Sequence, residues 1–453
     1  MDHRNNLFVY FICLVSAMGG LLFGYDWVVI GGAKPFYESF FGIADAPLLQ
    51  GLAMTTALIG CLIGAMAAGA MADRFGRKPL LIMASVLFTV SAWATGYFDD
   101  FTLFNIARFI GGIGIGVASA VSPMYIAEVS PAAVRGRMVS VNQMTIVLGI
   151  LGAQIVNMLI AQPVDDTVDP MSTWNVQSGW RWMFWAEAVP AGLFFILSWL
   201  IPESPVFVKL RNGEIEESGN GGKAGLKELF EPKYGRVLLL GLVVAVFQQW
   251  CGTNVIFNYA QEIFLGAGFN VDGMFINIVI TGIANVVFTI VALYTIEKWG
   301  RRTLMLIGSL GLGLIYLTLG TCYFFHVEGV MMVVLVVLAI SCYAMTLGPV
   351  TWVLLSEIFP HRIRGIAMAT CTFALWVGCC TLTYSFPPIN AALGSSGSFW
   401  IYAAICLCAY VFLLHRCPET KGKTLEELER SLTTDHSLRG GGVSSPIDKM
   451  MIT

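Results

Sequence analysis

A few polar residues stand inside long apolar stretches of the sequence, where they could do chemistry. Asp26 and Arg108 each interrupt such a stretch. A third stretch contains three amides close together: Gln248, Gln249 and Asn254. An ionisable group in apolar surroundings is costly and is a functional hypothesis by default. The amides can donate and accept hydrogen bonds with a neutral polar ligand, although they can equally join helices to one another. Gly252 loosens the helix between Gln249 and Asn254, which favours a discontinuous segment that lines a cavity.

The strongest candidate for binding and releasing a proton is Asp26. Its predicted partner is Arg108, the other strong charge early in an apolar stretch. A nearby cation favours the ionised carboxylate, whereas removal from water favours the neutral acid. If the balance changes as the site opens to one side and then to the other, Asp26 exchanges a proton in each cycle. The alternative is a static ion pair that only holds two helices together.

Other kinds of site are not visible in the sequence. The eleven cysteines mostly lie in apolar stretches without a Cys-x-x-Cys pair, and no histidine cluster has metal-ligand spacing. Gly112, Gly114 and Gly116 resemble part of a dinucleotide loop, but they follow no predicted strand and suit close helix packing. A net charge of −3 offers no basic field for nucleic acid. We therefore expect no enzyme, no cofactor, no metal site and no nucleic-acid partner.

The composition predicts that membrane helices position these residues. Hydrophobic residues make up 57% of the 453 residues and charged residues only 12%, which is about half the charged share of a soluble domain. A helix that spans a bilayer needs about 20 mostly apolar residues. Twelve such stretches lie near residues 7–31, 48–72, 79–97, 102–126, 137–162, 181–201, 236–265, 273–296, 303–325, 329–355, 365–387 and 397–415.

Lysine and arginine distinguish the two sides of the membrane. When alternate loops are assigned to opposite sides, most basic residues fall on one side, together with both termini. The opposite loops hold Lys34 and Arg181 but many acids, Glu38 among them. Because cytoplasmic loops are enriched in basic residues, we expect a multi-pass protein of the lipid bilayer with both termini in the cytoplasm.

Three short motifs occur twice, at nearly one spacing. The pairs are 73–78 with 297–302, 127–131 with 356–360 and 202–204 with 418–420, offset by 224, 229 and 216 residues. Each copy follows the second, fourth or sixth span of its half. Two parallel repeats of this kind are a transporter architecture. We predict two six-span halves at 1–201 and 236–415, a short cytoplasmic linker at 202–235 and a cytoplasmic tail at 416–453.

Acidic and basic residues recur in register at the repeated loops. Arginines at the inner mouth can pair with carboxylates of neighbouring helix ends, and breaking those pairs would gate alternating access. The alternative is that basic loops only orient the helices. We predict the pairs Asp73–Arg135 and Glu297–Arg364 within a larger cytoplasmic gating network. Its members are Asp73, Arg77, Glu128, Arg135 and Glu203 in the first half and Glu297, Arg301, Glu357, Arg364 and Glu419 in the second.

Six motifs follow one another along the chain. They are Phe-Gly-Tyr-Asp at 23–26, Gly-x-x-x-Asp-Arg-Phe-Gly-Arg-Lys at 69–78, Pro-Glu-Ser-Pro at 202–205, Phe-Gln-Gln-x-x-Gly-x-Asn at 247–254, Gly-Pro-Val-x-Trp at 348–352 and Pro-Glu-Thr-Lys-Gly at 418–422. In this order they resemble the sugar porter family of the major facilitator superfamily, over nearly the whole chain. The resemblance implies an all-α membrane protein with twelve transmembrane helices in two pseudo-symmetric six-helix bundles.

The resemblance also implies a function. Proton-coupled members carry an acid at the position of Asp26 and facilitative carriers carry asparagine. This implies secondary active, proton-coupled symport of a monosaccharide, D-xylose or a hexose such as D-glucose, by alternating access. A facilitative sugar uniporter, or a sugar sensor that does not transport, is the alternative. The positions that match the family's sugar site are Gln143, Gln248, Gln249, Asn254, Asn285, Trp352 and Trp376.

Three positions depart from xylose-transporting members of the family. Asn258, Leu375 and Cys379 stand where those members carry tyrosine, glutamine and asparagine. Either the preferred sugar differs or neighbouring residues compensate. The resemblance further implies a monomer in a bacterial inner membrane.

Overall fold

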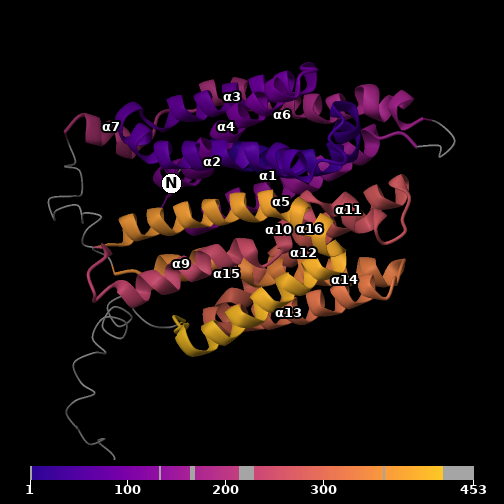
Figure 1. Cartoon of the computed structure of the whole chain (residues 1–453). Coiled ribbons are helices and arrows are strands. Elements are labelled where there is room, and N and C mark those ends of the chain that lie inside the picture. Colours follow the sequence, from indigo (N-terminus) through magenta and orange to yellow (C-terminus); the bar gives the residue numbers. More distant parts are fainter. Residues whose placement is uncertain (1–2, 132–133, 164–168, 214–228, 361–362, 422–453) are drawn as a thin grey trace, which may run out of the picture.

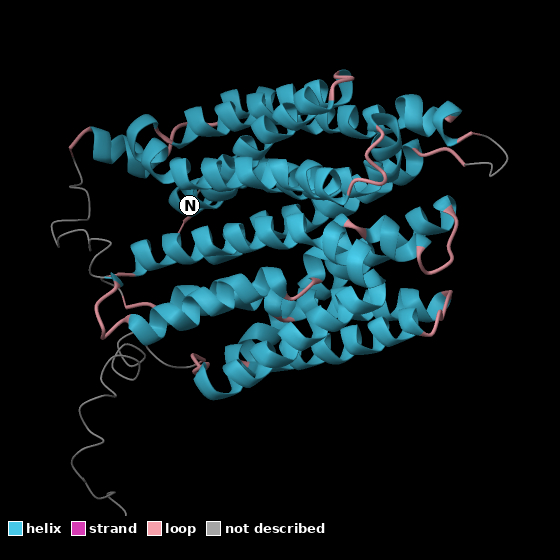
Figure 2. Cartoon of the chain, viewed as in Figure 1, coloured by secondary structure: helices cyan, strands magenta, loops and turns pink. Residues whose placement is uncertain are grey.

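The computed structural model describes residues 3–131, 134–163, 169–213, 229–360 and 363–421. These residues are almost entirely helical and contain no strand (Figure 2). The first half comprises six long helices, and a short one follows in the segment predicted as the linker. They are α1 (His3–Phe41), α2 (Pro47–Phe75), α3 (Arg77–Tyr97), α4 (Phe101–Val129), α5 (Arg135–Ile160), α6 (Trp180–Leu200) and α7 (Pro205–Arg211).

The second half contains eight helices of different lengths among the described residues. They are α9 (Gly235–Trp250), α10 (Thr253–Asn258), α11 (Ala260–Leu265), α12 (Val271–Trp299), α13 (Arg301–Phe324), α14 (Val330–Met345), α15 (Leu347–Ile358) and α16 (Arg364–Arg416). Figure 1 shows the two halves as neighbouring groups, with α1 to α6 on one side and α9 to α16 on the other.

Eleven helical stretches of the described residues are long and apolar enough to cross a membrane. The last of them, α16, has 53 residues and would be about 80 Å long if straight, whereas the hydrocarbon core is about 30 Å thick. It is not straight, because Gly394 leaves the helical region with φ 68° and ψ 175°. Figure 1 shows α16 running to one end of the molecule and returning. It therefore holds two crossings, and the prediction of twelve is confirmed.

The two ends of the molecule differ. We call the end with loops 73–78 and 297–302 the basic end. The start of α1, the short α7 and the last turns of α16 lie toward it, and α11 lies toward the opposite end (Figure 1). The termini of the helical body thus share one face, as an even number of crossings requires.

Helices α2 and α4 approach each other through glycines. A Cβ atom on Gly112 or Gly116 of α4 would overlap the backbone of α2 at Ala57 or Cys61. A Cβ atom on Gly60 or on Gly64 of α2 would likewise overlap the α4 backbone. Small residues at such spacing allow this close contact, so the glycine-rich segment of α4 serves helix packing, as predicted.

The first crossing extends further than the sequence suggested. We expected it to end near residue 31 and placed Lys34 and Glu38 in a loop, but α1 continues to Phe41. Both charged side chains are buried in the helix, with 1% and 7% exposure. They tolerate burial because the Lys34 ammonium pairs with carboxylates on α1 and α11.

The seventh crossing is broken twice. Gly252, between α9 and α10, has a left-handed backbone with φ 89°, which glycine adopts without strain. This break was predicted. The second break, at Tyr259 between α10 and α11, was not. Irregular backbone at membrane depth is tolerated only inside protein or beside a cavity, and α10 is indeed buried along its whole length.

Candidate functional site

The predicted ion pair between Asp26 and Arg108 is present. Arg108 Nη1 on α4 donates to Asp26 Oδ1 on α1, and Nη2 lies 3.5 Å from the Asp26 carbonyl oxygen. Both residues are 2% exposed. The Arg108 guanidinium also lies over the Phe184 ring of α6, 5.5 Å from its centroid. The pair therefore joins three helices of the first half.

A second buried acid completes this site. Glu187 on α6 is 2% exposed and interacts electrostatically with both Asp26 and Arg108. One guanidinium neutralises only one carboxylate, so the group carries a net charge of −1 when both acids are ionised. Asp26 Oδ2 and Arg108 Nε have no hydrogen-bond partner among the described residues. Binding one proton would make this group neutral in an apolar setting, where net charge is costly.

The predicted amides of the broken seventh crossing form a hydrogen-bonded chain. Gln248 Nε2 donates to the Tyr343 hydroxyl of α14 at 2.8 Å. Gln249 Nε2 donates to Gln248 Oε1, and Asn254 Nδ2 donates to Gln249 Oε1. Asn254 Nδ2 also lies 3.9 Å from Cys379 Sγ on α16. The turn at Gly252 allows this chain, because it brings Asn254 back toward the amides of α9.

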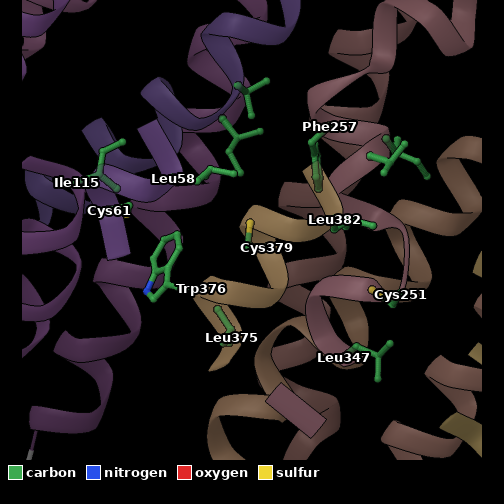
Figure 3. Close-up of a cluster of buried hydrophobic side chains, with 14 of the residues drawn as sticks. Leu58, Cys61, Ile115, Cys251, Phe257, Leu347, Leu375, Trp376, Cys379 and Leu382 are labelled. Atoms are coloured by element: carbon green, nitrogen blue, oxygen red, sulfur yellow. The ribbon is translucent and has the colours of Figure 1, made fainter. Parts of the chain in front are cut away.

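An aromatic cluster joins the two halves beside these sites. The Trp376 ring of α16 lies 6.3 Å from the Phe23 ring and 6.0 Å from the Trp27 ring, both on α1. Figure 3 shows Trp376 directed from the second half toward Cys61 and Ile115 of the first. Phe23 and Trp27 flank Asp26 in sequence. Helix α1 thus carries the buried acid and two of the three aromatic rings within two turns.

The other predicted sugar-site residues lie on separate helices. Asn285 on α12 is buried at 5% exposure, and Trp352 on α15 is 39% exposed. Gln143 is an exposed residue of α5. Of the seven predicted residues, the described contacts bring together Gln248, Gln249 and Asn254. A shared site for the full set stays a prediction.

At the basic end, the first half contains a compact charged network. The Arg77 guanidinium donates to Glu128 Oε1 at 2.9 Å and lies 3.7 Å from Asp73. The Glu203 carboxylate accepts from the backbone N–H groups of Arg77 at 3.0 Å and Lys78 at 3.2 Å. These N–H groups lie in the first turn of α3, where the helix dipole favours an anion. The Arg135 side chain lies outside the described part of the structure, and so does the predicted pair Asp73–Arg135.

The second half repeats this network. The Arg301 guanidinium donates to Glu357 at 3.0 Å and to Glu297 at 3.2 Å. The Glu419 carboxylate accepts from the Arg301 backbone N–H at 3.0 Å, at the start of α13. The predicted pair Glu297–Arg364 is replaced, because Arg301 engages Glu297 while the Arg364 guanidinium donates to the Phe359 carbonyl oxygen at 3.3 Å. Each network, as described, ties together helices of one half.

Comparisons with known proteins decide the family. The model of the family described as "Sugar (and other) transporter" matches residues 12–221 and 212–432. The chain belongs to this family. It is 36% identical to the D-xylose-proton symporter of Escherichia coli strain K12, over 94% of this chain and 96% of the relative. It is 35% identical to the arabinose-proton symporter of Bacillus subtilis, over 93% and 95% of the two chains.

Solved structures agree with this assignment. The inward open conformation of the xylose transporter from E. coli matches with a TM-score of 0.82 and 36% identity, over 93% of this chain and 99% of that chain. The major facilitator fold and the resemblance read from the sequence motifs are confirmed. The family and these relatives are transporters and not enzymes.

Sequence reasoning missed three residues of the site. Glu187 could have been found, since it is the one acid between residues 181 and 201 and an acid within a span deserves a functional hypothesis. Trp27 and Tyr343 had no such signal, because aromatic residues in apolar stretches usually serve packing. Only the fold places them against Trp376 and Gln248.

Proposed function

We propose that this chain is a proton-coupled monosaccharide symporter of the bacterial inner membrane, which imports D-xylose or a hexose such as D-glucose. One observation carries the proposal. The buried group Asp26–Arg108–Glu187 has two acids for one base, and it shares helix α1 with the aromatic cluster that reaches the second half. The names of the two symporter relatives support the same coupling ion and class of substrate.

Proton binding acts on the position of α1. When both acids are ionised, Arg108 holds α1 against α4 through Asp26. A proton on Asp26 removes the charge that Arg108 engages and leaves Glu187 as its partner. The attachment of α1 to α4 then weakens, so the proton biases which of two conformations is favoured. Halves 1–201 and 236–415 are the bodies that we expect to move against each other.

Sugar binding uses the amide chain and the aromatic cluster. In the structure, Gln248, Gln249 and Asn254 hydrogen-bond to one another. The hydroxyl groups of a monosaccharide both donate and accept, so they can replace these bonds without leaving an amide unpaired. The face of Trp376 suits the C–H face of a pyranose, as aromatic rings combine apolar area with defined geometry. The remaining predicted contacts are Gln143, Asn285 and Trp352.

We assign the basic end to the cytoplasm. Loops 73–78 and 297–302 are rich in arginine, and basic loops remain on the cytoplasmic side. Both termini then lie inside. The similarity to an inward open transporter is consistent with this orientation, since the charged networks at that end stay within single halves. We also expect the transporter to act as a monomer.

A sugar-induced proton flux tests the proposal. De-energised cells that produce the protein are suspended in weak buffer, and D-xylose, D-glucose, D-galactose and L-arabinose are added in turn. We expect the medium to become alkaline with at least one sugar and not to do so in Asp26→Asn. The matched control is Asp99→Asn, which removes an exposed carboxylate that pairs with Arg181, and it should keep the signal.

The contrary result supports a uniporter, the second candidate. If labelled sugar equilibrates across the membrane while the external pH stays constant with every sugar, the Asp26–Arg108 pair is structural and coupling is absent. If no sugar enters and none moves protons, the sensor interpretation remains.

A further inference from the structure

A buried ion pair crosses between the two halves, away from the proposed proton and sugar sites. Lys34 on α1 pairs with Glu262 on α11, and its ammonium lies 3.0 Å from Glu38 on α1. The ammonium also faces the Tyr259 ring, 5.2 Å from the centroid. The Lys34 side chain is 1% exposed and that of Glu262 is 27% exposed. A buried lysine requires such partners, because an unpaired charge there would be strongly destabilising.

Glu262 also contacts α16 of the second half. Its Oε2 accepts from Asn390 Nδ2 of α16 at 3.4 Å, and Asn390 Oδ1 lies 3.3 Å from the Ser395 hydroxyl beyond the Gly394 kink. Glu262 therefore lies between the Lys34 ammonium of the first half and an amide of its own half. Each carboxylate oxygen of Glu262 thus has its own partner, Lys34 in the first half and Asn390 in the second.

Further contacts close the same region between the halves. A Cβ atom on Gly31 would meet the Asn258 carbonyl oxygen at 3.0 Å. The Phe36 ring of α1 stacks on the Phe275 ring of α12 with centroids 6.4 Å apart. These contacts surround Lys34 at the end opposite the basic loops, where α11 lies in Figure 1. At the basic end, by contrast, the described ion pairs remain within one half.

Two breaks in the backbone separate the partner helix from α9. Helix α11 is six residues long and is separated from α9 by the breaks at Gly252 and Tyr259. Tyr259 is itself anchored, since its hydroxyl donates to the Thr383 carbonyl oxygen at 2.7 Å. A rotation at these breaks would carry Glu262 away from Lys34 and would leave α9 in place, with Tyr259 as the fixed point.

We propose that Lys34 and Glu262 are positioning residues of the transport cycle, which hold α1 against α11 and keep the entrance opposite the basic loops closed. The pair must separate once in each cycle for that entrance to open. It lies eight residues along α1 from Asp26, about 12 Å for an α-helix, so a shift of α1 at the proton site acts directly on it.

Hydrogen exchange of the purified full-length protein in lipid nanodiscs, without sugar, tests this inference. The variants are Lys34→Met, Glu262→Gln and the charge swap Lys34→Glu with Glu262→Lys. The swap also carries Glu38→Gln, because two carboxylates one turn apart on α1 would repel each other. Asp99→Asn is the control, because it removes an ion pair whose partner, Arg181, belongs to the same half. Since no substrate is used, the result does not depend on which sugar is carried or on proton coupling.

Opposite changes at the two ends are the expected result. In each single variant, backbone exchange at 31–41 and 253–265 should rise on the order of tenfold, as the equilibrium shifts toward an open entrance. Exchange at 73–78 and 297–302 should fall, because the basic end then closes. The charge swap should restore the original pattern, and the control should not change it.

Three results would overturn the inference. They are unchanged exchange in the single variants, faster exchange at both ends, which indicates a loosened fold, and a charge swap that folds but does not restore the pattern. If Lys34→Met does not fold, Glu262→Gln decides the test, because it breaks the contact between the halves and leaves Lys34 paired with Glu38.

Discussion

Replacing Arg108 by leucine should destabilise the protein far more than replacing Asp26 by asparagine. In the structure one guanidinium, that of Arg108, interacts with two acids, Asp26 and Glu187, and each acid is 2% exposed. Arg108→Leu leaves both acids without a cation, whereas Asp26→Asn leaves Arg108 with Glu187. Loss of one partner of a buried ion pair costs about 3–5 kcal/mol. We expect about 3 kcal/mol for Arg108→Leu, because the acids can take up protons instead, and about 1 kcal/mol for Asp26→Asn.

Thermal unfolding in detergent, followed by tryptophan fluorescence, measures this difference. With about 2.1 cal/mol/K of unfolding entropy per residue, a chain of 453 residues loses about 1 °C of Tm for each kcal/mol. Arg108→Leu should therefore lower the Tm by about 3 °C. Adding Asp26→Asn to Arg108→Leu should recover about half of the loss, since one acid is then neutral. If the two losses simply add, the acids and Arg108 are not coupled and the account of this site is refuted.

Other substitutions test the remaining parts of the structure. Trp376→Ala should weaken sugar binding by roughly tenfold, while Trp376→Phe should retain most of the affinity. Isothermal titration calorimetry measures both affinities, and equal losses would refute stacking. Gly116→Val should prevent accumulation of folded protein, because its side chain would overlap the α2 backbone. Gly192→Ala, which has open space around its Cβ position, should be neutral in the same expression and gel-filtration assay. Glu203→Gln and Glu419→Gln should each lower the Tm by about 1–2 °C, because each anion caps a helix start; a rise in Tm would contradict that role.

Sequence alone predicted the fold because the bilayer restricts the possibilities. Long apolar stretches must become helices, the repeated motifs reveal the two halves, and a buried aspartate needs a nearby cation such as Arg108. The same reasoning predicted the break at Gly252, since a glycine among amides loosens a helix. These features are either local in the sequence or repeated in its two halves, so a single sequence is enough to find them.

The errors concern contacts between distant segments. Lys34 seemed to belong to a loop because a lone lysine rarely enters a span, and its partner, Glu262, is 228 residues away. The pair Glu297–Arg364 was expected from register, but the turn at Gly300 brings Arg301 closer to Glu297. Such choices depend on how helices pack, which spacing along the chain does not encode.

Uphill accumulation in proteoliposomes tests the central claim most directly. Labelled D-xylose or D-glucose is supplied outside, with an imposed proton gradient directed inward. The account predicts that the wild type concentrates one of these sugars inside, and that Asp26→Asn exchanges it but only equilibrates it. Accumulation by Asp26→Asn equal to the wild type, or equilibration alone by the wild type under the gradient, would contradict proton coupling through Asp26.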